Sequence, residues 1–328
     1  MEQQPSSTAA RAYAWKSPAA DRMVEDAVRG VGADVAALGL PALAGVVLCG
    51  GYGRGEGGVK TDPATGREGL SNDLDFYVVT VPGASRADAE LIDRRLAEVG
   101  AAWSGRVGID VDFSPAKTPW RLHHDQERLM IQELVRGYAD VAGRPGSELF
   151  AGVERRDAAD LPWTEAVRLL VNRGAGLLLA REVAEGRERQ EGDFYPRNIA
   201  KCVLGAGDAR LIARRGYRWA AADRDAALGE TLYSRALAWK FRPVPEAPCG
   251  WEEAREAWLG ALDGVRGAGR PRRGPAHAAR WIARRRSVGA LRTFGYDPLV
   301  RILAGLEEAV RRGGGFPAEL RKDWTVFQ

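Results

Sequence analysis

The stretch Asp73-Leu74-Asp75-Phe76 alternates charged and apolar residues, and this alternation constrains the fold more than any other part of the chain. In an extended strand, successive side chains point to opposite faces. Leu74 and Phe76 therefore share a face that we expect to meet a core, and the two aspartates share the other face. The stretch continues through Val79 and predicts a half-buried β-strand with two carboxylates on its open side.

A cluster of glycines follows a second apolar segment. Residues 44–49 form an apolar run typical of a buried strand, and residues 50–56 (Gly-Gly-Tyr-Gly-Arg-Gly-Glu) come directly after it. Glycine tolerates backbone conformations that other residues avoid, and a glycine turn after a strand lets N–H groups approach a phosphate. The segment therefore predicts a phosphate-binding turn.

Residues 53–58 also fit the dinucleotide pattern G-x-G-x-x-G, with acidic residues about 20 positions further on. That pattern requires a helix directly after the glycines, whereas residues 59–69 are turn-like. It also places a single acid at the end of a strand, and here a spaced pair lies inside one. A protein kinase is disfavoured because its other motifs are missing.

Two carboxylates held close together repel each other unless a cation sits between them. Hard oxygen ligands of this kind suit Mg²⁺, which proteins usually hold with one or two carboxylates and substrate phosphates. Residues 107–113 form a second alternating stretch, with Asp110 and Asp112 on one face. A two-metal phosphoryl-transfer site needs about three converging carboxylates, which Asp73, Asp75 and one of these two can supply.

The first half of the chain predicts a mixed α/β domain. We expect a loose tail over residues 1–20, a helix over 21–38 capped by Asp21, and strands over 44–49, 73–81 and 106–113. A helix capped by Ser85 runs to about residue 99, and a turn-rich insert lies within residues 56–70. The alternation of strands and helices indicates a domain over 21–150.

From Trp163 onward the periodicity is helical. We expect helices over residues 164–183, 195–213, 220–239, 251–265, 276–291 and 298–312, with a Gly/Arg/Pro linker over 264–274. The fold class is therefore an α+β domain with a mixed sheet, followed by an all-α domain over 151–328.

Composition narrows the class of protein. The chain has 328 residues, 45% of them hydrophobic and 28% charged, which is ordinary for a soluble globular protein. No apolar run approaches the ~18 residues of a membrane span, and the amino-terminal residues are unlike a secretory signal. Three scattered cysteines and three histidines argue against a disulfide framework or a zinc site, so we expect a cytoplasmic protein with no membrane partner.

The joint motif resembles the DNA polymerase β-like nucleotidyltransferase superfamily. The resemblance rests on the strand and glycine turn at residues 44–56, the D-x-D strand and the later acidic strand ending at residue 113. The glycine segment is most similar to that of the bacterial uridylyltransferase that modifies a nitrogen-regulatory protein. The loop between turn and D-x-D is longer than usual, and no phosphohydrolase or regulatory domain follows.

The resemblance implies a role for each matched residue. Gly50 and Gly51 would contact the triphosphate of an NTP through their backbone, and Tyr52 and Arg54 join this nucleotide-binding set. Two Mg²⁺ ions would be held by Asp73, Asp75 and a third carboxylate, Asp112 or Asp110, which would also help to activate the attacking hydroxyl. We favour Asp112 because Val111 and Phe113 flank it as Leu74 and Phe76 flank Asp75.

The second half of the chain offers weaker signals. In related enzymes a helical domain supplies a cation to the triphosphate, and Lys201 is our candidate. The run Arg284–Arg286 is compatible with RNA binding or with a solvated helix face. His123, His124 and Asp125 resemble a metal-phosphohydrolase pair, but few other histidines support it. Residues 1–120 carry a net charge of −4 and residues 121–328 a net charge of +8, so the second half could face a polyanion.

These observations predict a Mg²⁺-dependent enzyme that transfers a nucleoside monophosphate from an NTP to an acceptor hydroxyl. A small molecule, such as an aminoglycoside or a sugar, is the favoured acceptor. A tRNA or a protein is the alternative, motivated by the basic second half. A non-catalytic nucleotide-binding module is the rival from another class.

Overall fold

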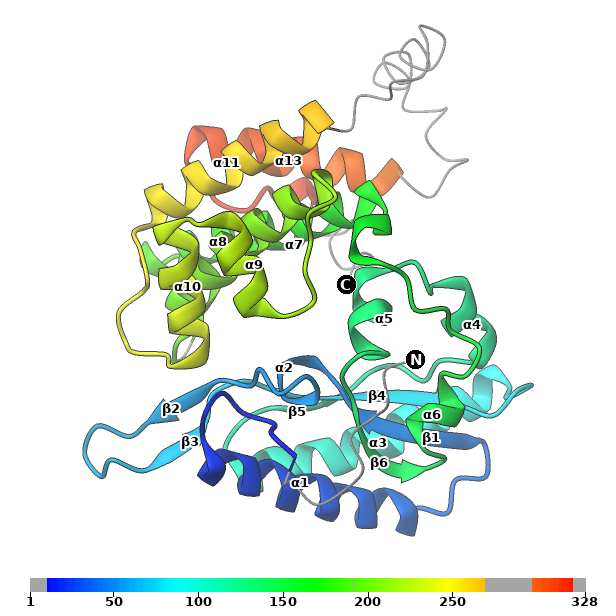
Figure 1. Ribbon diagram of the computed structural model, residues 1–328. Coiled ribbons are helices and arrows are strands. Elements are labelled where there is room, and N and C mark those ends of the chain that lie inside the picture. Colours follow the sequence, from blue (N-terminus) through cyan, green and yellow to red (C-terminus); the bar gives the residue numbers. More distant parts are fainter. Residues whose placement is uncertain (1–10, 191, 269–296, 321–328) are drawn as a thin grey trace, which may run out of the picture. The chain divides into compact units, whose positions relative to one another are not determined.

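The computed structural model describes residues 11–190, 192–268 and 297–320, which group into two compact units. Unit 1 comprises the described residues up to Arg156 together with Phe241–Pro243, and unit 2 comprises Asp157–Lys240 and the described residues from Val244 onward. Unit 1 is α+β and contains a mixed sheet, which confirms the fold class at this level, and the described part of unit 2 is helical (Figure 1).

The main sheet of unit 1 has four strands in the order β5-β4-β1-β6. Strand β1 is antiparallel to both β4 and β6, whereas β4 and β5 are parallel. The strands are β1 (Leu43–Leu48), β4 (Leu74–Thr80), β5 (Val111–Phe113) and β6 (Ala139–Gly143). Strand β6 was not predicted from the sequence, because it has only five residues and no regular alternation.

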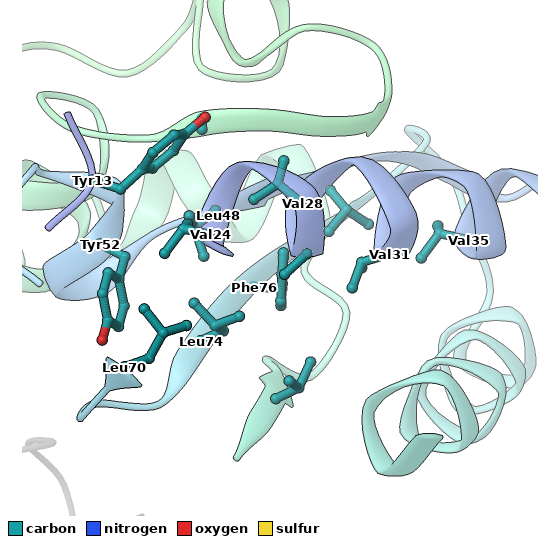
Figure 2. Packing of buried hydrophobic residues seen from close by; sticks show 14 of the residues in the cluster. Tyr13, Val24, Val28, Val31, Val35, Leu48, Tyr52, Leu70, Leu74 and Phe76 are labelled. Carbon is teal, nitrogen blue, oxygen red and sulfur yellow. The ribbon is translucent and has the colours of Figure 1, made fainter. Parts of the chain in front are cut away.

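One face of this sheet is covered by two long helices, α1 (Pro18–Ala37) and α3 (Arg86–Val107). Valines at intervals of three and four residues along α1 pack onto apolar residues of β1 and β4. Figure 2 shows this packing, with Val24, Val28, Val31 and Val35 of α1 beside Leu48, Leu74 and Phe76. The expected core side of the D-x-D strand is therefore the side that faces α1 and α3.

The opposite face is covered by short helices, α4 (Pro119–His124) and α5 (Leu129–Leu134). Leu122, Ile131 and Leu134 pack there against Val47, Tyr77 and Val79. A further short helix, α6 (Gly146–Leu149), packs beside β1. Tyr77 and Val79 of β4 are buried but Asp75 of the same strand is exposed, so the cover stops short of the aspartate.

Residues 11–20 differ from the expected loose tail. Tyr13 and Ala14 are buried, and this segment forms backbone hydrogen bonds with Gly57 (Trp15 N to Gly57 O, 2.8 Å; Gly57 N to Tyr13 O, 3.1 Å). Ser17, and not Asp21, caps α1, because its hydroxyl accepts a hydrogen bond from Ala20 N. Asp21 instead accepts from the backbone N–H groups of Tyr13 and Ala14, which fastens the segment to the helix.

The region between the glycines and the D-x-D strand is also more regular than expected. The turn-rich insert contains a hairpin of β2 (Val59–Thr61) and β3 (Glu68–Leu70), paired antiparallel. The tight turn at residues 62–66 joins the two strands, with Gly66 N donating to Asp62 O at 2.8 Å. The insert is therefore a second small sheet.

The third strand was predicted too long. Helix α3 begins at the predicted Ser85 cap, where Ser85 and Asp88 form a capping box, but continues eight residues past Val99. It ends at Val107 because Gly108 adopts a left-handed conformation with φ of 71°. Strand β5 therefore covers only Val111–Phe113, and the alternation at residues 107–110 is not strand.

The helices of unit 2 are α7 (Trp163–Ala184), α8 (Phe194–Ala213), α9 (Ala221–Leu228), α10 (Thr231–Phe241, whose last residue belongs to unit 1), α11 (Trp251–Ala268) and α13 (Asp297–Arg312), with short 3-10 turns at Ala158–Asp160 and Ala318–Leu320. Trp258 of α11 is fully buried and donates from its indole nitrogen to Leu170 O of α7 at 2.9 Å. The helix predicted over 220–239 is two helices, because Gly229 takes φ of 62° and ends α9.

Residues 264–268 of the predicted linker belong to α11, and the rest of it lies outside the described residues. The predicted helix over 276–291 also lies outside them. No helix in the described ranges is both long enough and apolar enough to cross a membrane.

Candidate functional site

Asp75 and Asp112 are neighbours across the parallel pair of β4 and β5. Their Cα atoms are register partners, between the pairs Leu74–Val111 and Phe76–Phe113. Leu74 and Val111 are buried in the core, and the rings of Phe76 and Phe113 stack at 5.0 Å. The two aspartates therefore project together from the opposite face, and both are exposed.

Asp73 and Asp110 lie one step before these strands. Leu74 N donates to Asp110 O at 2.9 Å, so the two segments remain paired at this end. Partial burial raises the pKa of Asp112 above its ordinary value, and the negative charges of Asp110 and Asp73 raise it further. The four carboxylates thus contribute to one negative region, in which Asp112 is the residue aligned with Asp75.

The glycine turn lies directly against this carboxylate pair. Strand β1 ends at Leu48, and Gly50–Gly53 form the short helical turn α2. Cys49 N donates to Asp75 O at 2.8 Å, and Gly50 adopts φ of 66°. A Cβ atom on Gly50 would lie 2.5 Å from Asp75 Oδ2, so a side chain at this position would force the Asp75 carboxylate to turn away from its present orientation.

Cys49, beside the turn, is not an activated nucleophile. Burial, and then the charge of Asp75, raise the pKa of its thiol to about 12. A thiol with this pKa stays protonated at neutral pH, and the thiolate is the reactive form. Covalent catalysis by this cysteine is therefore disfavoured.

Tyr52 supports the turn from inside the core. Its ring is 1% exposed, and its hydroxyl donates to Gly58 O at 2.7 Å and accepts from Ser71 N at 3.1 Å. This side chain is committed to the backbone, so only the main chain of Tyr52 is left to contact a nucleotide, and that contact stays a prediction. Its hydroxyl instead joins the loop after the glycines to the residues just before Asp73.

Arg54 is held between two acidic side chains. Its guanidinium lies 3.1 Å from Glu133 on α5 and 3.6 Å from Glu56, and only 19% of its side chain is exposed. An Arg with two carboxylate partners is largely neutralised locally. Arg54 therefore fastens the glycine segment to α5.

Arg11 belongs to the site but has no signal in the sequence. Its guanidinium donates to Gly53 O at 2.9 Å and also to Tyr138 O. It thereby ties the end of α2 to the residue before β6. No local motif marks this contact, which joins positions 42 and 127 residues apart.

The polar residues of interest in the second half of the chain, where they are described, belong to unit 2. Lys201 is half-buried on α8, whereas the four aspartates belong to unit 1. Asp208 is 3.0 Å from Arg224 and accepts from the Tyr233 hydroxyl at 2.8 Å, a buried network typical of structural support. The run Arg284–Arg286 lies outside the described residues.

The histidine cluster is a surface feature of α4. Asp125 pairs with Arg121 at 2.8 Å and with Arg128 at 3.3 Å, and His124 is 3.3 Å from the same carboxylate. In the described ranges no group of three or more His, Cys, Asp or Glu side chains is gathered as a metal would hold them. The aspartates of β4 and β5 nevertheless supply hard oxygen donors of the kind that Mg²⁺ prefers, and the turn at Gly50 lies against one of them.

A cavity of about 390 Å³ within unit 1 has Asp112 as one of its lining residues. Helix α3 contributes Asp93, Ala97, Ala101 and Ser104 to its lining, and residues 111–115, which include Asp112, form the rest. The cavity therefore lies beside β5, which is an edge strand of the sheet.

Comparisons of the chain with protein-family models, curated proteins and solved structures gave no significant match. Its function is therefore inferred from the residues of this chain and their geometry.

Proposed function

We propose that this chain is a Mg²⁺-dependent nucleotidyltransferase with its catalytic residues in unit 1. The observation that carries the proposal is the register of Asp75 with Asp112, with Gly50 packed against the Asp75 carboxylate. A phosphate-binding turn and paired carboxylates are needed together for a metal-bound triphosphate. Here the glycine turn and the aligned aspartates lie in one small region, which supports the proposal.

Each residue has a role in this proposal. Asp73, Asp75 and Asp112 would hold the metal ions, with Asp110 adding negative charge beside them. Gly50 and Gly51 would offer backbone N–H groups to the phosphates. When bound, the metal would neutralise charge that develops on the phosphate oxygens. Lys201 of unit 2 stays a candidate for a contact with the triphosphate.

The proposed reaction is an in-line displacement. The acceptor hydroxyl oxygen forms a bond to the α-phosphorus, and the bond from that phosphorus to the oxygen bridging it to the β-phosphate breaks. Pyrophosphate leaves with the electron pair of that bond. The hydroxyl proton passes to the carboxylate of Asp112 and from there to solvent. The protein then contributes mainly positioning, with two carboxylates fixed by the sheet.

A calorimetric titration tests the nucleotide site. Each NTP with Mg²⁺ is titrated into the wild type and into the double variant Asp73→Asn/Asp75→Asn. We expect Mg²⁺-dependent binding that is lost in this variant and abolished by EDTA. The matched control is Glu90→Gln/Glu98→Gln, which removes two exposed carboxylates of α3 and should bind as the wild type does. Equal binding by the two double variants, or no binding by the wild type, would overturn the proposal.

Release of pyrophosphate tests the chemistry. Asp112→Asn should retain nucleotide binding within a few-fold but lower the transfer rate on the order of 100-fold or more, as loss of a general base does. Metal-dependent binding by the wild type with no pyrophosphate release in the presence of any acceptor class would instead assign a non-catalytic nucleotide-binding module.

A further inference from the structure

The cavity beside β5 is built from small side chains at regular spacing. Ala97, Ala101 and Ser104 occupy one face of α3 because they are separated by four and three residues. Gly100 brings the helix close to the strand, since a Cβ atom there would lie 2.6 Å from Val111 O. The helix therefore contacts the strand at Gly100 and leaves room along the face of small residues.

The walls of the cavity are held in place. The Ser104 hydroxyl donates to Gly100 O and accepts from Val111 N, both at 2.9 Å, which satisfies an outward N–H of the edge strand. Asp93 Oδ1 accepts from Ala116 N at 2.8 Å. The ring of Phe113 is fixed by its stack on Phe76. A ligand would therefore meet a preformed wall, which lowers the cost of ordering it on binding.

The charge of the lining has one sign. Its lining residues include Asp93 and Asp112 and no Lys or Arg, and the Asp112 carboxylate itself projects from the opposite face of the sheet, beside its strand neighbour Asp75. A cleft lined by one sign of charge attracts ligands of the opposite sign. The phosphate backbone of RNA would be repelled here, whereas an ammonium group would be attracted.

The remaining lining is apolar. Ala97 and Ala101 lie on the helix side, and Val111, Phe113 and Pro115 lie on the strand side. A volume of about 390 Å³ falls in the range of roughly 300–1,000 Å³ that is typical of small-molecule sites. An aromatic face also favours a nearby cation. The lining thus fits a small molecule that combines an amine with an apolar ring or chain.

We propose that the cavity between α3 and β5 binds a small organic cation, and that such a cation is the acceptor whose hydroxyl is modified. The statement that this cation is the acceptor rests on the proposed function. Asp112 belongs both to the cavity lining and to the carboxylate region, so a cation bound there lies against the edge strand whose opposite face carries the carboxylates that would perform the transfer.

The first experiment measures binding of tyramine to the full chain without nucleotide or metal, by calorimetry. Its comparison compounds are neutral 4-ethylphenol and anionic 4-hydroxyphenylacetate. We expect tyramine to bind at least about tenfold more tightly than the neutral compound, since an ammonium group near carboxylates at a protein surface gains attraction that an uncharged group lacks. Equal affinity for the cation and the neutral compound would overturn the proposal.

Matched variants locate the site. Ala101→Trp fills the cavity and should abolish tyramine binding, whereas Ala102→Trp, at the next exposed position of α3 but outside the lining, should not. Asp93→Asn should weaken binding several-fold, whereas Glu98→Gln should leave it unchanged. Thermal unfolding of all four variants checks that they fold. Undiminished binding by folded Ala101→Trp would place the cation elsewhere and refute the site.

A transfer assay distinguishes binding of the cation in the cavity from its role as the acceptor. Labelled NTP with Mg²⁺ is incubated with the hydroxylated amines tyramine, ethanolamine and glucosamine. We expect a labelled product with wild type that is lost in Ala101→Trp, while metal-dependent NTP binding persists in that variant. Tyramine binding without any labelled product overturns the acceptor assignment alone. Failure of NTP binding to wild type refutes the proposed function and leaves the cation site standing.

Discussion

At the scale of single residues, Gly50 brings two separate features of the sequence together. Its left-handed conformation turns the chain after β1, and its missing side chain leaves space for Asp75 Oδ2. Both features disfavour a side chain at this position, but for different reasons. The first is a local preference of the backbone, and the second is a contact with a strand that lies 25 positions further along.

Replacing Gly50 with alanine should therefore cost more than the backbone preference alone. Gly39→Ala is the matched control, because Gly39 has φ of 58° and a Cβ atom added there would meet nothing within 4 Å. We expect the control to lose about 1–2 kcal/mol of unfolding free energy, the cost of a left-handed residue with a side chain. Gly50→Ala should lose more and should also abolish Mg²⁺-dependent NTP binding. Equal losses in chemical denaturation would show that the contact with Asp75 is unimportant.

The Tyr52 hydroxyl gives a second prediction at this scale. Tyr52→Phe removes the hydroxyl that binds both Gly58 O and Ser71 N and leaves these two groups only their own bond to each other at 3.3 Å, which should cost about 1–3 kcal/mol. Tyr77→Phe is the control, since Tyr77 is also buried but no hydrogen bond of its hydroxyl is seen in the described ranges. Urea denaturation of both variants measures the difference, and a similar loss for the two would refute a bracing role for the Tyr52 hydroxyl.

At the scale of elements, pairs of helices are joined by charged hydrogen bonds. Arg266 of α11 and Glu307 of α13 form such a contact, with Nη1 and Oε1 2.7 Å apart. The hydrogen bond from Arg266 lowers the pKa of Glu307 below its ordinary value of 4.5, and Arg311 lowers it further. The ionised carboxylate is therefore the form that the folded unit favours.

This contact predicts a dependence of stability on pH. Because the folded pKa is lowered, the stabilisation is present above pH 4.5 and is lost as the pH falls through the folded value. Glu307→Gln should be less stable at pH 7 by about 1 kcal/mol and should show a smaller loss between pH 7 and pH 3. Denaturation curves at several pH values, with the exposed Glu308→Gln as control, measure both effects. An unchanged pH profile in Glu307→Gln would exclude the pair as its source.

At the scale of the whole molecule, each unit has its own core. The sheet of unit 1 is buried between α1 and α3 on one face and α4 and α5 on the other. In unit 2, α7 and α8 pack along their length, and Trp258 fills the space beside them. Separate cores imply that damage to one unit is confined to that unit.

A variant that removes a large side chain from the core of unit 1 tests whether damage stays within that unit. Leu96→Ala on α3 removes a fully buried side chain and should cost about 2–5 kcal/mol in unit 1. Hydrogen exchange should then become faster in the sheet and in α1 and α3, whereas the amides of α7 and α8 should keep their wild-type protection. Equal loss of protection in both units would indicate a single cooperative unit.

The sequence by itself determined the features that depend on near neighbours. The alternation at residues 73–76 set the buried and open faces of β4, Ser85 as a capping residue marked the start of α3, and helical spacing identified α7 and α8. It failed at residues 106–110, where alternation indicated a strand. Helix α3 instead continues to Val107 and ends there because Gly108 adopts a left-handed conformation. Over so few residues, periodicity cannot distinguish the end of a helix from the start of a strand.

Only the tertiary structure decided how these parts meet. It aligned Asp112 with Asp75 and placed Gly50 against that carboxylate, and it bound Arg11 to the glycine turn. In the folded chain Tyr52 is buried in the core, and Arg54 forms an ion pair with Glu133. These contacts join residues far apart in the chain, and their partners are fixed by strand register and packing. Local preferences carry no information about either, because many different partners satisfy the same local pattern.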